Sequence, residues 1–170
     1  MDGMGLYIFS AVGDFKGMAY LGDFLGGLFH GIGKLAYFQD GNGKMIYYGS
    51  WAEGKKTNFG VNYYENPHTY YIGEWNNDLK HGDGKIVFPD GEFKGNWVAN
   101  ERVGSGTLVK RNKGLKTVWE GQWKQDYLPI GTVIYYDDRN NEIGRYEGTL
   151  KDGKKHGIGT YKWKGAIFEG

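Results

Sequence analysis

Cysteine is absent from the 170 residues, and proline occurs only 3 times. The lack of cysteine excludes disulfides, thiolate metal sites and a cysteine nucleophile, and it is typical of a cytoplasmic protein. No apolar run approaches the roughly 20 residues that a membrane helix needs. The apolar stretch from Leu6 to Val12 follows Asp2 rather than a basic segment, so we interpret it as a first strand and not as a signal peptide.

Glycine and aromatic residues are abundant, with 31 glycines and 17% aromatic side chains. Three segments place them at identical offsets: Tyr20-Leu-Gly-Asp-Phe24 with His30-Gly-Ile-Gly33, Tyr71-Ile-Gly-Glu-Trp75 with His81-Gly-Asp-Gly84, and Tyr146-Glu-Gly-Thr-Leu150 with His156-Gly-Ile-Gly159. If the first aromatic residue is position 0, glycine stands at position 2, an aromatic residue or leucine at 4, histidine at 10, and glycine at 11 and 13. Such self-similarity is the signature of a repeat protein.

Three weaker copies fill the gaps, so that repeats begin at residues 20, 47, 71, 93, 119 and 146, and a partial one begins at 168. We number them repeats 1 to 6. Repeats 2 and 5 lose the His-Gly element, and repeat 5 reaches Gly131 after a one-residue deletion. This pattern divides the chain into an N-terminal segment, residues 1–17, expected to be a capping strand, and a repeat array, residues 18–170.

The array resembles the MORN (membrane occupation and recognition nexus) repeat, whose pattern is Tyr-x-Gly-x-Trp-x-x-Gly-x-x-His-Gly-x-Gly followed by a turn with Asp-Gly. The resemblance covers residues 18–170. It implies an all-β fold, an elongated and twisted single-layer antiparallel sheet of tandem β-hairpins. Similar proteins include ciliary radial-spoke heads, cytoskeletal scaffolds and junctional proteins, and similar repeats precede lipid-kinase and methyltransferase domains.

The spacing itself is typical of hairpins. Positions 0, 2 and 4 share one face of a strand, so a bare glycine lies between two rings and can accept a ring over its backbone. We expect the glycines at positions 11 and 13 to do the same on the second strand. Asp40-Gly41 and Asp90-Gly91 predict two-residue turns with positive φ at glycine. Position 7 predicts a further positive-φ site, since it holds Gly27, Gly54, Asp78, Asn100, Asp126 and Gly153.

Catalytic chemistry finds little support in these residues. The three histidines at position 10 are separated by whole repeats, and none of Ser10, Ser50 and Ser105 stands in a nucleophile elbow. Gly49 to Lys55 and Gly148 to Lys154 match Gly-x-x-x-x-Gly-Lys only because the repeat has that spacing. We therefore expect a non-catalytic protein without a metal or cofactor.

The position 0 and 4 rings of repeats 2 to 5 are either core alone or core plus a docking strip for a helix or peptide of a protein partner. They are Tyr47, Trp51, Tyr71, Trp75, Phe93, Trp97, Trp119 and Trp123. A basic segment predicts a patch for an anionic partner, made by Arg102, Lys110, Arg111, Lys113 and Lys116. The uncapped edge at Phe168 to Gly170 indicates that the native chain continues or that another chain, which includes a second copy, pairs there.

Three functions stay open. The leading hypothesis is a structural scaffold or protein-docking module, and the resemblance places it in a cytoplasmic, cytoskeletal or ciliary assembly. The alternative is a module that binds anionic phospholipid such as phosphoinositides through the basic second half. The third is a regulatory segment of a larger enzyme. No feature indicates a nucleic-acid partner.

Overall fold

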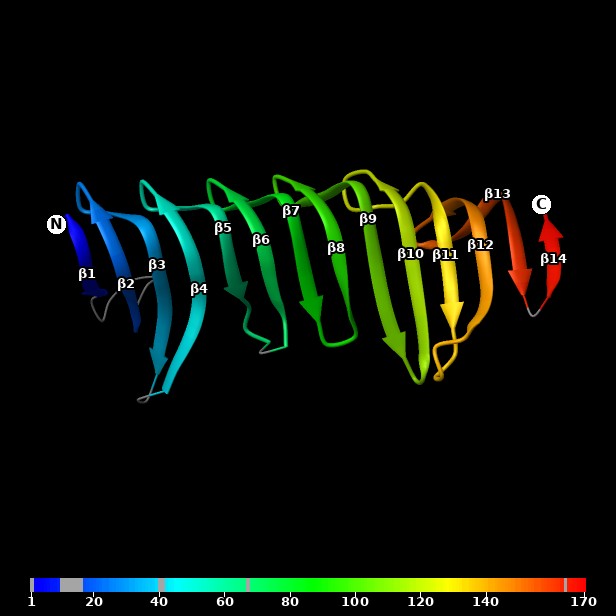
Figure 1. Cartoon of the computed structure of the whole chain (residues 1–170), viewed down its shortest axis with the longest axis horizontal. Helices are drawn as coiled ribbons and strands as arrows, with labels where there is room; N and C mark the ends of the chain where they lie inside the picture. Colours follow the sequence, from blue (N-terminus) through cyan, green and yellow to red (C-terminus); the bar gives the residue numbers. More distant parts are fainter. Residues whose placement is uncertain (1, 10–16, 40–41, 67, 164) are drawn as a thin grey trace. The chain divides into compact units, whose positions relative to one another are not determined.

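The computed structural model describes residues 2–9, 17–39, 42–66, 68–163 and 165–170. These residues form fourteen β-strands and no helix, and the strands follow one another in chain order in one open antiparallel sheet (Figure 1). Every pair of consecutive strands is a hairpin, as the repeat predicts. The expectation of an all-β array of tandem hairpins is therefore confirmed.

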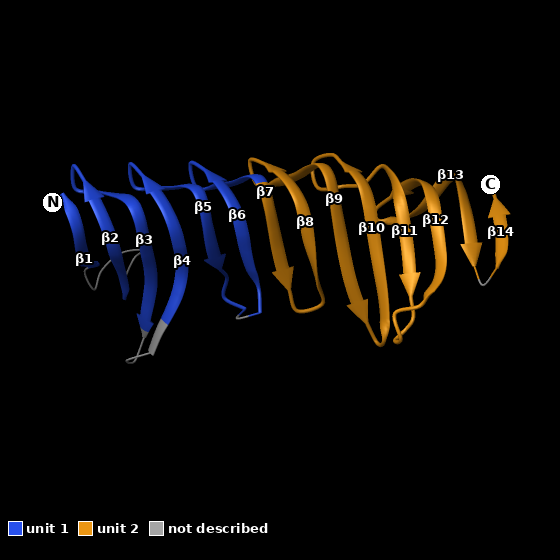
Figure 2. Cartoon of the chain, in the orientation of Figure 1, with its two compact units in different colours: residues 1–82 blue, residues 83–170 orange. Residues whose placement is uncertain are grey.

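The chain divides into two compact units, Met1–Gly82 and Asp83–Gly170 (Figure 2). Unit 1 holds β1 (Gly3–Ile8), β2 (Met18–Leu25), β3 (Leu28–Gln39), β4 (Asn42–Ala52), β5 (Lys55–Tyr63), β6 (Tyr70–Asn76) and the start of β7 (Leu79–Phe88). Unit 2 holds the rest of β7 together with β8 (Gly91–Val98), β9 (Glu101–Asn112), β10 (Leu115–Trp123), β11 (Ile130–Tyr136), β12 (Glu142–Lys151), β13 (Lys154–Trp163) and β14 (Ala166–Glu169). The predicted first strand is shifted: β1 ends at Ile8, and residues 10–12 lie outside the described part.

The turn inside each repeat has positive φ at two adjacent residues, positions 6 and 7, as in a type I′ turn. In repeat 4 these are Ala99, with φ 49°, and Asn100, with φ 74°. The predicted positive φ at position 7 is confirmed in all six repeats, at Gly27, Gly54, Asp78, Asn100, Asp126 and Gly153. Position 6 was not predicted, because residues such as Glu53 and Ala99 give no turn signal of their own.

The turns between repeats differ from the prediction. Asp40-Gly41 lies outside the described residues. At Asp90-Gly91 the turn is formed by Pro89 and Asp90, and Gly91 is the first residue of β8 and has no positive φ. Gly91 is needed for another reason: a Cβ there would lie 1.9 Å from the carbonyl oxygen of Val109 on β9. The place of this turn was right and its geometry was wrong.

A β-bulge interrupts the second strand of most repeats. Gly22 pairs with Gly33, but the next residue, Asp23, pairs with His30, and Gly31 inside the bulge has φ 59°. Position 11 has the same left-handed φ at Asn58, Gly82, Gly104 and Gly157. Glycine at position 11 therefore serves the bulge and not ring packing, which corrects the expectation. Repeat 5 has no left-handed residue at this place, and between the pairs Gly121–Gly131 and Lys124–Tyr127 its second strand has one extra residue where repeat 1 has two.

Ring packing over glycine holds at position 13. A Cβ on Gly33 would lie 2.3 Å from Cζ of Tyr20, and one on Gly60 would lie 2.4 Å from Cζ of Tyr47. The aromatic residues at positions 0 and 4 therefore lie on one face of the sheet, here called the ring face, against a floor of bare backbone. The opposite side is called the outer face.

Candidate docking surface

The predicted docking strip forms the core of the array. Seven of its eight rings are buried, with at most 6% of their surface exposed: Tyr47, Trp51, Tyr71, Trp75, Phe93, Trp97 and Trp123. Trp119 is half-buried, and its indole N–H donates a hydrogen bond of 3.0 Å to the carbonyl of Gly153. For the seven buried rings the core interpretation holds. A docking surface must therefore be sought among the half-exposed side chains beside them.

The core rings are held by two hydrogen bonds that recur along the chain. The hydroxyl of a tyrosine at position 0 donates to the carbonyl at position 3, over 3.1 Å for Tyr20 and Asp23 and over 3.0 Å for Tyr71 and Glu74. A tryptophan at position 4 donates from Nε1 to the position 13 carbonyl of the preceding repeat, for example Trp51 to Gly33 at 3.2 Å. Trp75, Trp97 and Trp123 repeat this bond with Gly60, Gly84 and Gly106. The tryptophans thus tie repeats 2 to 5 each to the repeat before it.

In repeats 1 to 4, position 9 carries a side chain that covers the ring of position 0. In repeat 1 it is Phe29, which stacks on Tyr20 with a centroid distance of 3.8 Å. In repeat 4 it is Arg102, whose guanidinium carbon lies 5.4 Å from the Phe93 ring and 4.7 Å from the Trp123 ring. In repeats 2 and 3 it is Lys56 and Lys80. Repeat 6 has Lys155 at this position, which lies over Tyr161 instead, and repeat 5 has Leu128. The ring face therefore has a row of covering residues, mostly cationic, that the sequence analysis missed.

Lys56 is the most enclosed of these cations. Its Nζ lies 5.1 Å from the Tyr47 ring and 4.8 Å from the Trp75 ring, and it donates a 2.6 Å hydrogen bond to Oδ1 of Asn62. Asn62 is a polar side chain in the buried core, at position 15, where repeat 1 has Leu35. Burial lowers the pKa of Lys56, and nearby Asp78 opposes that effect. Repeat 2 thus replaces the apolar Phe29 and Leu35 of repeat 1 with a hydrogen-bonded polar pair.

The predicted basic patch does not form as one surface. Arg102 lies at the start of β9 and the other four residues lie near its far end or on β10, so about 26 Å of strand separates Arg102 from Lys110. Arg102 donates to Asp126 from Nε at 2.7 Å and covers two rings. Lys110 forms an ion pair of 2.7 Å with Asp90, and this bond holds the pKa of Asp90 below its usual range. These two cations are therefore engaged within the chain.

At the tip of the β9–β10 hairpin, Lys116 bonds to Asn140 and lies 3.7 Å from the Tyr136 ring. Arg111 and Lys113 are exposed, and neither has an ion pair or a side-chain hydrogen bond among the described residues. Two free cations at a hairpin tip are typical of a solvated turn. The five residues therefore do not lie in one cluster, and binding of an anionic partner by any of them stays a prediction.

A second aromatic row lies on the ring face at position 17, two residues after the core position 15. All of its aromatic members are half-exposed. They are Tyr37, Tyr64, Phe88, Tyr135 and Trp163, and only repeat 4 has a non-aromatic residue there, Lys110. This row was readable in the sequence, because an aromatic residue recurs at offset 17 in four repeats and at offset 16 in repeat 5, which has the one-residue deletion. The sequence pattern used to define the repeat ends at the glycine of position 13, so it gave no expectation for this row.

In unit 2 this row widens into an aromatic platform made by Tyr135, Tyr161 and Trp163. The three ring centroids lie 6.0 to 6.4 Å apart. Tyr135 on β11 and Trp163 on β13 flank Gly144 on β12, and a Cβ on Gly144 would lie 2.3 Å from the Trp163 ring. Bare backbone at Gly144 therefore allows the platform to form.

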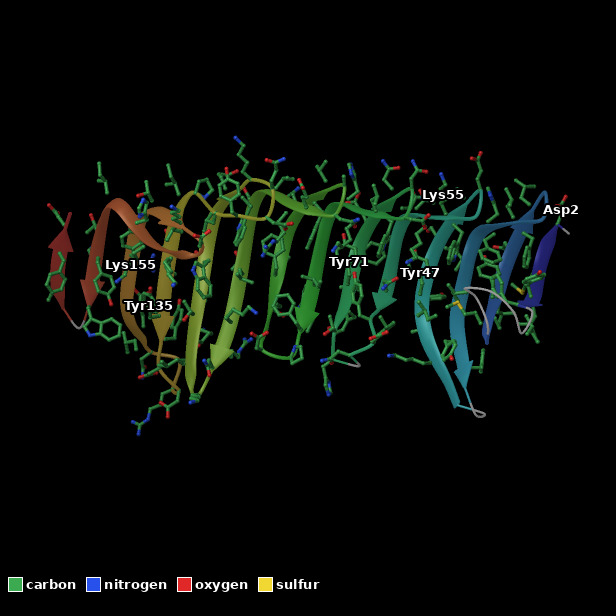
Figure 3. The ribbon with its side chains drawn as sticks, turned by 180° about the vertical axis from the view of Figure 1, so that it is seen from behind. Asp2, Tyr47, Lys55, Tyr71, Tyr135 and Lys155 are labelled. Atoms are coloured by element: carbon green, nitrogen blue, oxygen red, sulfur yellow. The ribbon has the colours of Figure 1, made fainter. Side chains whose placement is uncertain are left out.

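A lysine borders this platform. Nζ of Lys155 lies 3.4 Å from the Tyr161 ring centroid. In Figure 3 Lys155 is nearer than Tyr135 to the upper row of hairpin turns. Lys151 and Lys154 face each other across the same turn. None of these three lysines has an ion pair or a side-chain hydrogen bond within the described part of the chain. Lys155 opposes Leu150 on the ring face, so it is the lysine beside the platform, whereas Lys151 and Lys154 point to the outer face.

The outer face of unit 1 is also apolar. A cavity of about 270 Å³ there is lined by Leu6, Ala19, Leu21, Lys34, Ala36, Phe38 and Met45. A second cavity, of about 300 Å³, lies beside β1 on the ring face and is lined by Tyr7, Phe9, Phe24, Gly27, Leu28, Phe29 and Gly54. Both are apolar hollows in which Lys34 is the one charged residue, so neither places an acid, a base and a nucleophile together.

The histidines act through their backbone. The Tyr20 hydroxyl lies 3.3 Å from the carbonyl of His30, and the Tyr71 and Tyr146 hydroxyls approach His81 and His156 in the same way. Among the residues that the structure describes, no three His, Cys, Asp or Glu side chains are grouped so that they could hold a metal ion. The same residues include no helix long and apolar enough to cross a membrane.

Regular hairpins, glycine floors and bonds from each repeat to its predecessor define a tandem β-hairpin repeat protein. The MORN repeat pattern matches residues 20–43, 47–66, 71–92, 93–114 and 146–165, which is more than half of the chain. The chain therefore belongs to the MORN repeat family, as its sequence suggested. The match passes over repeat 5, the one without a left-handed residue in its second strand.

A curated relative is MORN repeat-containing protein 3 of Xenopus laevis, which is 36% identical over 72 residues. The matched segment is 41% of this chain and 29% of that relative. The chain thus matches less than a third of the length of this relative.

Proposed function

We propose that the chain is a non-catalytic docking module whose aromatic platform in unit 2 binds a helix or peptide of a protein partner. The observation that carries this proposal is the half-exposed row of Tyr135, Tyr161 and Trp163 beside a core that is otherwise closed. Half-exposed aromatic side chains on a rigid sheet offer large apolar contact area at a low entropic cost.

The charge beside the platform supports a partner with acidic side chains. Lys155 lies on the ring face beside the platform and has no ion pair in the described chain, so a carboxylate of a partner could pair with it there. A protein partner is favoured over a lipid surface because the larger basic patch expected from the sequence is divided and partly neutralised. We further propose a cytoplasmic, cytoskeletal or ciliary setting, on the resemblance of the repeat alone.

The test is capture of partners from the native cell with matched variants, followed by mass spectrometry. Lys155→Glu and Tyr135→Ser change the platform, whereas Lys162→Glu changes an exposed lysine on the outer face of the same strand. We expect wild type and Lys162→Glu to retain the same protein, and the two platform variants to lose it. A protein that all four chains capture equally would contradict the proposal.

A second arm separates proteins from membranes. The same four chains are sedimented with phosphatidylcholine vesicles that contain or lack phosphatidylserine, at moderate salt. Binding only to the anionic vesicles, lost in Lys155→Glu and kept in Tyr135→Ser, would replace protein docking with membrane recognition.

A further inference from the structure

The outer face of unit 1 carries four large apolar side chains that are between 50 and 55% exposed. They lie on the neighbouring strands β2 to β5 of this unit (Figure 2), and they are Leu21, Ile32, Tyr48 and Phe59. On the ring face of the same strands, Tyr20, Tyr47 and Trp51 are at most 5% exposed. A group of half-exposed apolar side chains beside a closed core is typical of a surface that another protein covers.

One row of side chains crosses this face from β2 to β5. Leu21 on β2 lies opposite Lys34 on β3. Lys34 also lies opposite Tyr48 on β4, and Tyr48 lies opposite Val61 on β5. Lys34 is the one charged member of the row, and it forms no ion pair or side-chain hydrogen bond with the residues that the structure describes. A molecule that covers this row must therefore be apolar and must also accept a cation.

A second row differs in side-chain size between its two ends. Ala19 on β2 lies opposite Ala36 on β3, and both line the cavity of about 270 Å³ on this face. Met45 on β4 lies opposite Ala36, and Tyr63 on β5 stands two residues beyond Val61 on the same side of the strand. The face therefore has small side chains on β2 and β3 and large ones on β4 and β5.

We propose that the outer face of unit 1 binds the same face of a second copy, so that two sheets pack face to face in a symmetric dimer. A two-fold axis parallel to the strands, between β3 and β4, keeps each row opposite the same row of the other copy. It places the small side chains of β2 and β3 against the large ones of β4 and β5. It also places Lys34 of one copy against Tyr48 of the other.

The contact at the axis matches the charge of the row. The ammonium of Lys34 lies over the Tyr48 ring of the other copy, where the ring attracts it, and the symmetry makes this contact twice. The methylene stem of Lys34 packs against the apolar side chains around it. An axis perpendicular to the strands would instead set Lys34 against Lys34, and like charges repel.

The area of this face suits a stable dimer. The strands β2 to β6 span about 24 Å, and the 7 residues of β6 span about 23 Å. The flat footprint is therefore about 550 Å² for each copy, and protruding side chains enlarge its accessible surface. Stable interfaces bury about 600 to 1,000 Å² of each partner. The proposed partner platform lies on the ring face of unit 2, so this association is independent of partner docking.

The test is sedimentation velocity of the whole chain over a range of concentrations. Wild type is expected to change from monomer to dimer as the concentration rises. Lys34→Glu sets an acid against the tyrosine ring, and Tyr48→Lys sets a lysine against Lys34, so each variant alone should remain a monomer. An equimolar mixture of the two variants should dimerise. In the mixed pair the introduced acid faces the introduced lysine, and the remaining Lys34 faces the remaining Tyr48.

Two variants in unit 2 are matched controls. Tyr127→Lys makes the same exchange at a tyrosine that is 49% exposed, and Lys94→Glu changes an exposed lysine on the outer face of β8. Both should dimerise like wild type, and far-ultraviolet circular dichroism verifies that every variant folds. A wild type that is monomeric at every concentration would overturn the proposal, because a different protein would then have to cover this face. So would undiminished dimers of Lys34→Glu or Tyr48→Lys alone, or a mixture of the folded variants that stays monomeric.

Discussion

Repeats 1 and 2 fill the same two core positions, 9 and 15, with different side chains. Placing the side chains of repeat 1 into repeat 2 gives a quantitative test of the core. Lys56 and Asn62 of repeat 2 stand where repeat 1 has Phe29 and Leu35. The perturbation is therefore Lys56→Phe, Asn62→Leu and the double variant, which transplants the apolar pair.

The expected magnitudes follow from the contacts. Asn62→Leu removes the acceptor of the 2.6 Å bond from Lys56 and leaves a buried ammonium without it. A hydrogen bond to a charged group contributes about 1.5 to 3 kcal/mol, so we expect a loss of about 2 kcal/mol. Lys56→Phe leaves the Asn62 carbonyl oxygen without its donor, while Nδ2 still donates to Tyr63 at 3.2 Å. Stacking on Tyr47 offsets part of that cost, so we expect a loss of about 1 kcal/mol.

The double variant removes both partners of the bond between Lys56 and Asn62, and only the Tyr63 carbonyl loses a donor, the Nδ2 of Asn62. Its stability should return to within about 1 kcal/mol of wild type, which gives a coupling energy of about 2 kcal/mol. Urea unfolding followed by circular dichroism measures all four chains, and an unchanged m-value shows that midpoints report stability. If the single losses simply added in the double variant, to within about 0.5 kcal/mol, the polar pair would not be coupled and the reasoning would be refuted.

Three further predictions concern the repeated features. Tyr71→Phe should lower the free energy of unfolding by about 1 kcal/mol, and Tm by about 2 to 4 °C in a thermal melt, because it removes the bond to Glu74 while Phe93 shows that the ring packs without a hydroxyl. Gly82→Ala should cost about 1 to 2 kcal/mol in urea unfolding from its φ of 54°, and more than Gly104→Ala, since only at Gly82 would the new Cβ lie 2.4 Å from a Glu74 carboxylate oxygen. Equal losses would assign the cost to φ alone. Burial raises the pKa of Tyr20 from 10.0 to about 12. The contribution of the neutral Tyr20 hydroxyl to the free energy of unfolding is therefore complete below pH 10.0 and is lost as the pH rises toward about 12. Unfolding in urea across this range should show that decline, and Tyr20→Phe should make it shallower.

The sequence predicted the features that depend on spacing along one strand. Glycine between two aromatic residues located the ring face, and the substitutions at position 7 located the turn, because only a few residue types tolerate positive φ. The bulge at position 11 was misread as ring packing, although Asn58 in place of glycine was itself a sign of left-handed φ.

The functional surfaces were less accessible to sequence reasoning. Lysines and arginines that are close in sequence predict one patch. In a strand, however, successive side chains point to opposite faces and the chain rises about 3.3 Å per residue. Arg102 and Lys110 consequently meet different partners, Asp126 and Asp90. The platform depends on Tyr135 and Trp163, which are separated by a whole strand and meet only because Gly144 between them has no side chain. Such proximity appears only once the register is known.

Position 9 shows how a fixed core can present a variable surface. Its side chain covers a position 0 ring whether it is Phe29, Lys56 or Arg102, since an aromatic ring accepts an apolar face or a cation. The ring at position 0 therefore accepts an apolar or a cationic cover, and where the cation is enclosed a matched core residue accompanies it, as Asn62 does for Lys56. We infer that the ring face of a repeat acquires its polarity at position 9, so exchanging Lys155 for phenylalanine should weaken an acidic partner without a large loss of stability. A loss of stability above about 2 kcal/mol in urea unfolding would instead make the cation part of the core.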